Sequence, residues 1–547
     1  MGQAVHSRKS LMQRFLDGVE KVGNLVPHPV LIFVILILIV IALSHLLASL
    51  EVGVSFEAIV PTANSDSADS TEYHPDLYES GGVDPSPASD EKSYTLEQQT
   101  IVARSLLTAE GIRFIYISLI PSFMGFTAVG LMIAAMIGAG VAEESGLVNA
   151  LIRKLVILSP TWALIYILSF VGILSSIAAD AGYLVLIPLA GTAFISIGRH
   201  PLAGLALGFA AVAGAFTVNM LIKPLDAVLV EFTNDAIQLV DPDKTIGLAS
   251  NIWFSIASVI LLTGIVALTT TKIIEPRLGK YDPSLGTDGP ANSQKKSKLT
   301  AKESRGLLFA FIALAATLLA FGFLTIPSGA PLRDPETDVL IGNSPFMNGL
   351  IALIMVLFLV TGAAYGYGAG TLTSFTAIIK SMEKAMSGLG SLILLFFVLS
   401  QFVSYFNYTN MGTILALKLA ELLETANFPA LLLLLGFILV VAIIDLLITG
   451  AIAKWALFAP IFVPLLMTLA VAPEAVLAAY RIADSPINTI TPLNAYFALV
   501  VGFAQKYDKN AGVGTVVSLM LPYVLVMFVL WTALFVVWQM LGLPWGI

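Results

Sequence analysis

Long runs of apolar residues recur along the chain and limit its fold more than any other feature. The first run covers residues 30–49 and the last covers 515–540. About 20 apolar residues in a helix cross the roughly 30 Å hydrocarbon core of a bilayer, and helices satisfy their own backbone hydrogen bonds there. The 547 residues are 57% hydrophobic and 12% charged, where a soluble domain carries about 25% charged residues. The sequence therefore predicts an all-α polytopic membrane protein.

Several classes of function are disfavoured by what the sequence lacks. It contains no Cys, which excludes thiolate catalysis and thiolate metal sites. The five His show no metal-site spacing, and there is no Gly-rich phosphate loop of the Walker type. The net charge of −8 argues against nucleic-acid binding. We therefore expect neither an enzyme nor an ATP-driven pump, and no cofactor other than Na⁺.

The loops between the apolar runs indicate orientation, because Lys and Arg accumulate on the cytoplasmic side. Residues 1–29 contain four basic residues, which predicts a cytoplasmic N-terminus and a retained first transmembrane helix at 30–50 rather than a cleaved signal peptide. Residues 51–113 contain twelve acidic and three basic residues and are expected to form a mobile periplasmic loop. Residues 272–305 contain eight basic and four acidic residues and are expected in the cytoplasm.

Two pairs of apolar segments are short for complete spans. One pair lies near 161–198 and is separated by SSIAADAG, and the other lies near 429–471 and is separated by LLITGAIAK. Each pair predicts either a re-entrant hairpin that turns inside the membrane or two ordinary antiparallel helices.

An internal repeat favours the hairpins. A shift of 272 residues carries Pro188 onto Pro460 and Pro201 onto Pro473. Secondary transporters are commonly built from repeated halves, often inverted, with hairpins and broken helices at the binding site. The two expected repeats are 114–271 and 306–547.

A stretch rich in helix breakers follows the second hairpin. The sequence ADSPINTITP at 483–492 places a carboxylate, hydroxyls, a carboxamide and prolines between apolar flanks, and AVAGAFTVN at 211–219 is its milder counterpart. Unwound backbone in a membrane presents carbonyl groups and half-helix ends that bind ions. The alternative is an ordinary loop between two spans. We expect a binding site that includes Asp484, Asn488, Thr489, Pro492 and Asn494.

Charged side chains in apolar segments need a partner or a function, since each costs about 2.5–3.5 kcal/mol at a helix centre. Asp180 lies at the expected tip of the first hairpin, and Lys454 and Trp455 lie at the tip of the second. Arg481 and Asp484 are one helical turn apart. The simpler alternatives are an interfacial tip for Asp180, snorkelling for Lys454, an interface aromatic for Trp455, and a local ion pair between Arg481 and Asp484.

Together these residues predict a pocket for an organic anion with an aromatic part. Arg481 and Lys454 would pair with carboxylates, and Trp455 would stack on a ring. Asp445 and the segment from Lys223 to Asp226 are interpreted as helix-end residues outside the site. The candidates for binding Na⁺ or carrying a proton are Asp180, Asp484, Asn488 and Thr489.

The segments YRIADSPINTITPLNAYF at 480–497 and AKWALFAPIFVP at 453–464, with the Asp180 hairpin, resemble the p-aminobenzoyl-glutamate transporter (AbgT) family. The resemblance spans nearly the whole chain. It implies a homodimer in the bacterial inner membrane, with nine spans and two re-entrant hairpins in a core-plus-scaffold arrangement. It also implies cation-coupled movement of p-aminobenzoyl-glutamate, or export of p-aminobenzoate-like compounds and sulfonamide antimetabolites. The positions that match functional residues of the family are Asp180, Trp455, Pro473, Arg481, Asp484 and Pro492.

One position departs from the family pattern. Ile452 lies three residues before Trp455, where a small hydroxyl residue is expected. The fold also resembles that of the wider divalent-anion/sodium symporters, so the alternative function is sodium-coupled symport of di- or tricarboxylates or of short-chain carboxylates. A passive channel and an intramembrane enzyme are disfavoured, because paired hairpins suit alternating access and the apolar segments offer no nucleophile–base pair.

Overall fold

The computed structural model describes residues 29–61, 94–160, 163–178, 182–286, 299–341, 344–415, 418 and 429–547, with only the backbone given for 55–61 and 94–99. Its membrane part is helical, as the apolar runs predict. Eight helical stretches among these residues are long and apolar enough to cross a membrane. The chain is therefore a multi-pass membrane protein.

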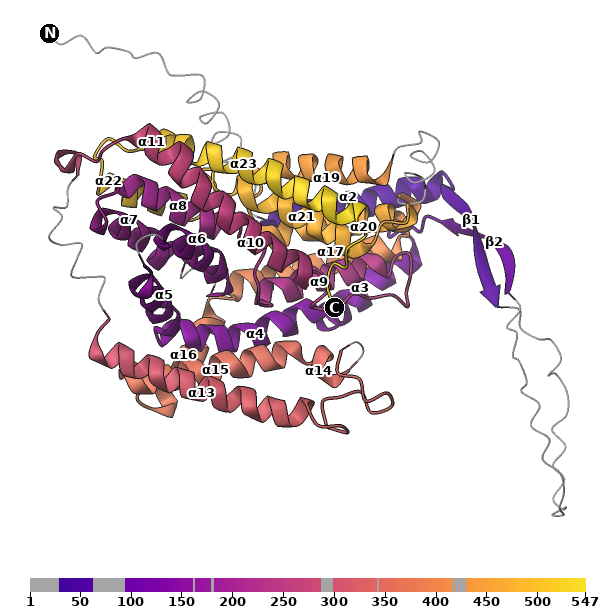
Figure 1. The fold of residues 1–547 in the computed structure, drawn as a ribbon. Helices are drawn as coiled ribbons and strands as arrows, with labels where there is room; N and C mark the ends of the chain where they lie inside the picture. Colours follow the sequence, from indigo (N-terminus) through magenta and orange to yellow (C-terminus); the bar gives the residue numbers. More distant parts are fainter. Residues whose placement is uncertain are drawn as a thin grey trace, which may run out of the picture.

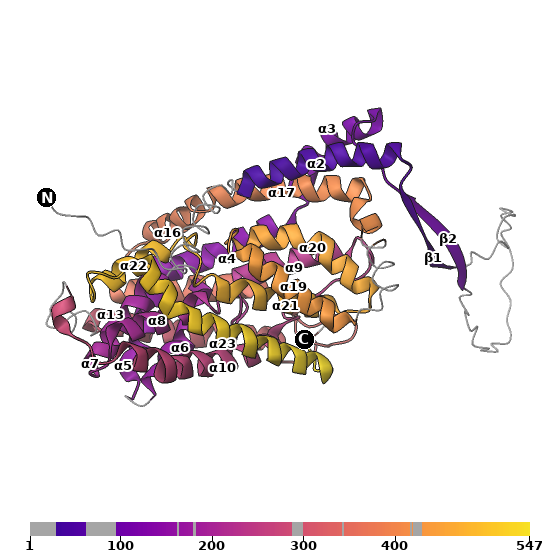
Figure 2. The ribbon, with the colours of Figure 1, turned by 90° about the horizontal axis from the view of Figure 1, so that it is seen from above.

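The helices divide by their packing partners into an outer and an inner set. The outer helices are α2 (Pro29–Ser49), α3 (Ala109–Met124), α4 (Thr127–Glu144), α5 (Leu147–Leu158), α13 (Ala301–Thr325), α14 (Pro345–Asn348), α15 (Leu350–Ala369), α16 (Phe375–Ser387) and α17 (Gly390–Tyr408). Helix α13 packs on α15, α15 packs on α4, and α17 packs on α2. Figure 1 shows α13, α15 and α16 along one edge, and Figure 2 shows α2 and α17 along another.

The inner set surrounds the segments that the sequence singles out. It comprises α6 (Leu164–Leu174), α7 (Ile187–Ser196), α8 (Pro201–Ala213), α9 (Pro224–Ile237), α10 (Ile252–Thr269), α11 (Glu275–Leu278), α19 (Ala430–Asp445), α20 (Ala451–Thr468), α21 (Pro473–Ile487), α22 (Phe497–Gln505) and α23 (Val513–Met540). In the apolar stretch of α20, 67% of the residues are buried, compared with 11% in that of the outer helix α13. Helix α13 therefore presents most of its apolar side chains to the outside, whereas α20 is enclosed by other helices.

A two-stranded ribbon occupies part of the segment 51–113, which the sequence predicts to be a loop, while its mobility and its periplasmic side stay predictions. Strand β1 (Gly53–Pro61) pairs antiparallel with β2 (Tyr94–Val102), with Gly53 opposite Val102, and Figure 1 shows the ribbon projecting from the helices. Helix α3 also begins inside this segment, at Ala109. β-Branched and aromatic residues in both strands favour extended backbone. The all-α prediction therefore holds for the membrane part alone.

Both predicted hairpins appear as pairs of helices separated by a break. The first consists of α6 with a 3₁₀ turn at Ser175–Ala178, and then α7 with a π turn at Gly182–Leu186 before it. The second consists of α19 and α20. The second arm, α20, packs chiefly on α9, and α19 packs chiefly on α21. Each arm of the second hairpin thus packs on a helix that borders an interruption, α9 or α21. The re-entrant character of both hairpins and the total of nine spans stay predictions.

The structure has breaks between helices at both positions where the sequence predicts interruptions, while their location inside the membrane stays a prediction. Helix α8 ends at Ala213 and α9 begins at Pro224, and helix α21 ends at Ile487 and α22 begins at Phe497. Pro224 occupies the first turn of α9, where its missing N–H costs nothing. The repeat is also visible in these bounds, because α8 begins at Pro201 and α21 begins at Pro473. The inverted relation of the two halves stays a prediction.

Glycines allow α4 and α15 to approach closely. A Cβ at Gly138 would overlap the backbone of Met355, and a Cβ at Gly362 would lie 2.7 Å from the Ala142 nitrogen. We expect Gly138→Leu to destabilise the protein by about 1–3 kcal/mol or more, because backbone cannot move aside as a side chain can. The midpoint of thermal unfolding in detergent measures this loss. Gly130→Leu on the same helix is the matched control, since nothing lies within 4 Å of its added Cβ, and equal melting of the two variants would contradict the prediction.

The predicted orientation is tested by cysteine labelling, since the chain contains no Cys. We expect Ser67→Cys to react with an impermeant maleimide applied to intact cells, and Ser297→Cys to react only after the membrane is opened. Both positions lie outside the described residues. Labelling of both cysteines in intact cells would reverse or invalidate the assignment of loops 51–113 and 272–305 to opposite sides.

Candidate functional site

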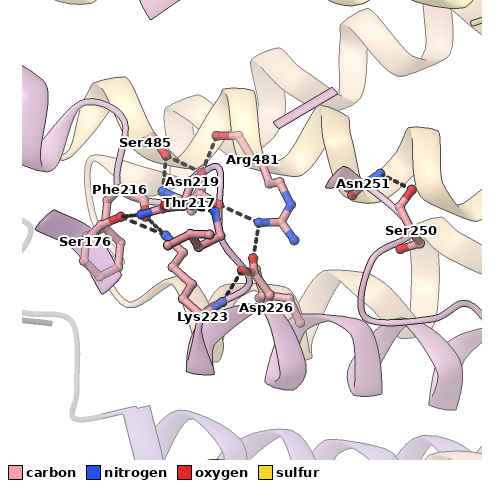
Figure 3. A network of polar contacts seen from close by, with 12 residues as sticks. Ser176, Phe216, Thr217, Asn219, Lys223, Asp226, Ser250, Asn251, Arg481 and Ser485 are labelled. Atoms are coloured by element: carbon pink, nitrogen blue, oxygen red, sulfur yellow. Dashed lines mark hydrogen bonds and ion pairs between the residues drawn. The ribbon is translucent and has the colours of Figure 1, made fainter. Parts of the chain in front are cut away.

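The first helix interruption contacts the last turns of α21, just before the second interruption. Thr217, from the first interruption, donates its backbone N–H to Ser485 Oγ at 3.1 Å and its hydroxyl to the Arg481 carbonyl at 2.9 Å. The Thr217 and Ser485 hydroxyls are also hydrogen-bonded to each other. The first of these bonds satisfies the Thr217 backbone N–H, which lies beyond the end of α8. Figure 3 shows that the contacts join the 214–223 segment directly to α21.

Arg481 forms a buried ion pair, but its partner is far away in sequence. Its Nη1 lies 2.6 Å from Asp226 Oδ1 and 2.5 Å from the Thr217 carbonyl oxygen (Figure 3). The Arg481 and Asp226 side chains are 3% and 10% exposed. The alternative of a local pair between Arg481 and Asp484 is therefore wrong. Asp226 does lie in the first turn of α9, as a helix-end residue, yet it belongs to this polar centre.

Lys454 and two carboxylates form a second buried cluster, which we call the lysine triad (Asp445, Lys454 and Asp484). Lys454 Nζ is ion-paired with Asp445 Oδ1 and lies 2.6 Å from Asp484 Oδ1, and all three side chains are 0% exposed. Snorkelling of Lys454 is therefore wrong, because its amine does not reach solvent. The interpretation that Asp445 lies outside the site is also wrong. Asp445 is the last residue of α19, and it contacts Lys454 there.

The three members of the lysine triad are held unequally. Asp484 also accepts hydrogen bonds from the Tyr480 hydroxyl at 3.2 Å and from Asn488 Nδ2 at 3.3 Å. Among the described residues, Asp445 forms an ion pair with Lys454 alone, so its carboxylate depends on that one charge. Two carboxylates and one ammonium leave the triad with a net charge of −1 when all are ionised. A buried negative charge of this kind attracts a cation.

Trp455 is buried between helices in this conformation. Its indole N–H donates to the Leu229 carbonyl at 2.9 Å and to Thr233 Oγ1 at 3.1 Å, and its ring lies 4.6 Å from that of Tyr480. Its exposed fraction is 0%, so a role as an interface aromatic is wrong. The side chain joins α20 to α9, and the predicted stacking on a substrate ring stays a prediction.

The remaining candidates lie around the second interruption. Asn488 donates to the Asp484 carbonyl at 2.8 Å, Thr489 donates to the Pro486 carbonyl at 2.8 Å, and Asn494 donates to the Asn488 carbonyl at 2.9 Å. Pro492 is half-buried in the same turn. Pro473 is buried at the start of α21, away from this turn. Asp180 lies outside the described residues.

Two cavities flank the beginning of α20. The smaller, of about 280 Å³, is lined by Asp484, Asn488 and Asn494 together with Tyr183 and Tyr496, whose rings stack at 4.1 Å. The larger, of about 380 Å³, lies between the outer helices α4 and α17 and the inner set. Phe216, Gly450 and Ala451 line both. The site can therefore hold a ligand on either side of the α20 tip.

In the part of the chain that the structure describes, no group of three or more His, Cys, Asp or Glu side chains is placed to hold a metal ion. A bound Na⁺ would depend on Asp484 with amide, hydroxyl and carbonyl oxygens around the second interruption, which are hard ligands of the kind that such ions take.

Two of the polar residues that the sequence interpretation left outside the site are Asp226 and Asp445. The signal that points to them is their charge in otherwise apolar surroundings, which implies a buried partner. Both residues lie at helix ends, where charged residues are common, so the sequence interpretation gave their charge no functional meaning.

Comparisons with known proteins match this architecture over nearly its whole length. The family model described as "AbgT putative transporter family" matches residues 14–547. The p-aminobenzoyl-glutamate transport protein of Escherichia coli (strain K12) is 32% identical over 528 residues, which cover 96% of this chain and 95% of that protein.

Two solved structures share the fold. The YdaH transporter of Alcanivorax borkumensis, described as having an unusual topology, superposes with a TM-score of 0.83 at 38% identity, covering 95% of this chain and 100% of that one. MtrF of Neisseria gonorrhoeae, described in connection with a class of antimetabolite efflux pumps, superposes with a TM-score of 0.82 at 37% identity, covering 96% and 97%. The chain therefore belongs to the AbgT transporter family, a family of membrane transporters and not of enzymes.

Proposed function

We propose that this chain is a secondary active transporter of aromatic carboxylates of the p-aminobenzoyl-glutamate type in the bacterial inner membrane. The observation that carries the proposal is the pair of broken helices that meet through Thr217, Arg481 and Ser485 beside two cavities. Interrupted helices with buried charges are costly in a membrane and are typical of the binding centres of secondary transporters. Export of p-aminobenzoate-like compounds and sulfonamide antimetabolites belongs to the same proposal, supported by the relatives' described activities.

We further propose that transport is coupled to a gradient of H⁺ or Na⁺. The lysine triad has a net negative charge, and its member Asp484 lies at the wall of the smaller cavity. Binding of a proton or of Na⁺ would neutralise that charge, which lowers the cost of moving the site through a low-dielectric region. Asn488 and Thr489 supply neutral oxygens nearby, and Asp180 stays a candidate from the sequence.

A sodium-coupled symporter of di- or tricarboxylates is the second candidate function. The inner set buries three cationic side chains, Lys223, Lys454 and Arg481, and several cations suit several carboxylates. Two of the three already have carboxylate partners in the protein. One free cation therefore suits a single carboxylate beside an aromatic ring, as in p-aminobenzoate, better than citrate, and the second carboxylate of p-aminobenzoyl-glutamate would have to bind neutral donors.

Flux into proteoliposomes tests the proposal. Labelled p-aminobenzoyl-glutamate, p-aminobenzoate, a sulfonamide and citrate are supplied separately, with Na⁺ and H⁺ gradients imposed one at a time. We expect uphill movement of at least one aromatic compound that stops when one gradient is collapsed. Protein-free liposomes are the control. Movement of citrate alone would favour the second candidate, and downhill leakage that ignores both gradients would contradict secondary active transport.

The homodimer that the resemblance implies stays a prediction. The outer helices carry many exposed apolar side chains, which either lipid or a second copy of the chain can cover. The mass of the purified protein in detergent, with bound lipid and detergent subtracted, distinguishes one copy from two.

A further inference from the structure

The larger cavity has the composition of a site for an amphipathic molecule. Its wall includes Met132 and Met136 from α4, Leu392 from α17, and Phe216 and Ile452 from the inner set. Its volume of about 380 Å³ lies in the range of small-molecule sites, which is about 300–1,000 Å³. Thioether and aromatic side chains adapt well to a flat apolar ring.

Lys223 lines this cavity and is 1% exposed. Its Nζ contacts neutral oxygens, namely Ser176 Oγ at 3.3 Å and the Phe216 carbonyl, and it lies 5.1 Å from the centre of the Phe216 ring. Figure 3 shows Lys223, Ser176 and Phe216 gathered at the 214–223 segment. The ammonium therefore has hydrogen-bond acceptors, but no carboxylate of the described residues lies within ion-pair distance of it.

The other two buried cations of the inner set differ from Lys223 in this respect. Lys454 and Arg481 each form an ion pair with a carboxylate, whereas no ion pair of Lys223 is present in the part of the chain that the structure describes. The nearby Asp226 carboxylate accepts the Lys223 backbone N–H at 2.9 Å and binds Arg481 with its other oxygen. A buried ammonium without a counter-charge is costly unless a ligand supplies one.

We propose that the larger cavity is the binding site for an aromatic acid, whose carboxylate pairs with Lys223 Nζ and whose ring lies among Met132, Met136 and Phe216. This inference rests on the proposed transport of aromatic carboxylates and identifies where the anion binds. It differs from the interpretation from sequence, which placed the carboxylate at Arg481 and Lys454. Both of those side chains are already paired within the protein.

Glu143 gives the cavity a second polar contact. It lines the same space from α4, and a carboxylate can accept more hydrogen bonds than one. An aromatic amine at the end of the molecule remote from its carboxylate would find an acceptor there. The site therefore favours amino-substituted aromatic acids over unsubstituted ones.

The smaller cavity then serves the cation. It carries Asp484 of the negatively charged triad, while the larger cavity carries the unpaired ammonium of Lys223. The anion and the coupling cation would bind on the two sides of the α20 tip, with Phe216, Gly450 and Ala451 lining both cavities. Movement of this tip would affect both ligands together.

Equilibrium binding of labelled p-aminobenzoate to the purified full-length protein tests the role of Lys223. We expect Lys223→Gln to weaken binding about 10- to 150-fold, the range for one charge-assisted hydrogen bond, and Lys223→Arg to retain more of the affinity. Lys384→Gln is the matched control, because Lys384 is 67% exposed and pairs with Glu144 at the surface. Glu143→Gln should reduce the preference for p-aminobenzoate over benzoate. Equal affinity of Lys223→Gln and Lys384→Gln would overturn the inference.

Photolabelling of the unmodified protein decides the matter if Lys223→Gln fails to fold. We expect 4-azidobenzoate, a photoreactive analogue, to label Met132, Met136 or Leu392, and excess p-aminobenzoate to prevent this. Labelling confined to Tyr496 and its neighbours would place the acid in the smaller cavity and overturn the inference. The proposed function would survive that result if proteoliposomes still accumulate aromatic acids, whereas absence of coupled uptake would remove the proposed function itself.

Discussion

Lys454→Met is expected to cause the largest loss of stability of any single substitution considered for this protein. The change leaves the Asp445 and Asp484 carboxylates facing each other without their shared ammonium, and all three side chains are 0% exposed. Removal of one partner from a buried ion pair costs about 3–5 kcal/mol, because an uncompensated charge stays in a low-dielectric interior. The midpoint of thermal unfolding and the yield of monodisperse protein in detergent measure the effect.

A second substitution should recover most of this loss. Lys454→Met combined with Asp445→Asn leaves a single carboxylate, Asp484, which still has Tyr480 and Asn488 as hydrogen-bond donors. We expect the double variant to unfold well above the single variant, since neighbouring charges couple strongly in such cycles. Lys384→Met at the surface is the control for loss of a lysine. If Lys454→Met and the Lys384→Met control had the same midpoint of thermal unfolding, the triad would not be a buried ionic cluster.

Arg481→Met is expected to have the second largest effect, on both folding and transport. It removes the guanidinium charge opposite Asp226 on α9 and the hydrogen bond to the Thr217 carbonyl that joins α21 to the first interruption. We expect about 3–5 kcal/mol of destabilisation, again because a carboxylate is left buried and unpaired. Thermal unfolding in detergent and uptake into proteoliposomes are measured on the same preparations.

The partner of Arg481 determines which double variant is rescued. Arg481→Met with Asp226→Asn should restore stability, whereas Arg481→Met with Asp484→Asn should not, because Asp484 pairs with Lys454 instead. If the junction between the first interruption and α21 takes part in transport, the rescued protein should fold but transport poorly. Near-normal uptake by that double variant would show that the pair is structural alone, and rescue by Asp484→Asn would contradict the ion pairing described here.

The local features of this fold were readable from the chain itself. Apolar runs predicted the helices, since backbone in lipid must be satisfied within its own segment. Prolines and small polar residues at 483–492 predicted the interruption between α21 and α22, because proline lacks an N–H and Asn and Thr bond to nearby backbone. The shift of 272 residues that matches Pro201 with Pro473 also relates the starts of α8 and α21, which lie at these two prolines.

Amphipathic helices and the ribbon were harder to predict. Helix α9 carries Asp226, Glu231 and Asp235 within an apolar pattern, so its charges concealed a helix whose apolar side chains are buried. The strands β1 and β2 lie far apart in sequence, on either side of the segment 62–93. Their pairing depends on a contact that no local pattern specifies.

The sequence by itself determined that this chain spans a membrane, where its helices break, and which charges lie in apolar surroundings. The tertiary structure alone decided how those charges pair. Arg481 lies one turn from Asp484 on α21, yet it bonds Asp226 from α9, and Lys454 takes both Asp445 and Asp484. Residues one turn apart can meet, but a buried charge pairs with whichever partner the packed helices bring within reach, because desolvation makes every alternative costly. That same packing left Lys223 without a carboxylate and placed it at the wall of the larger cavity.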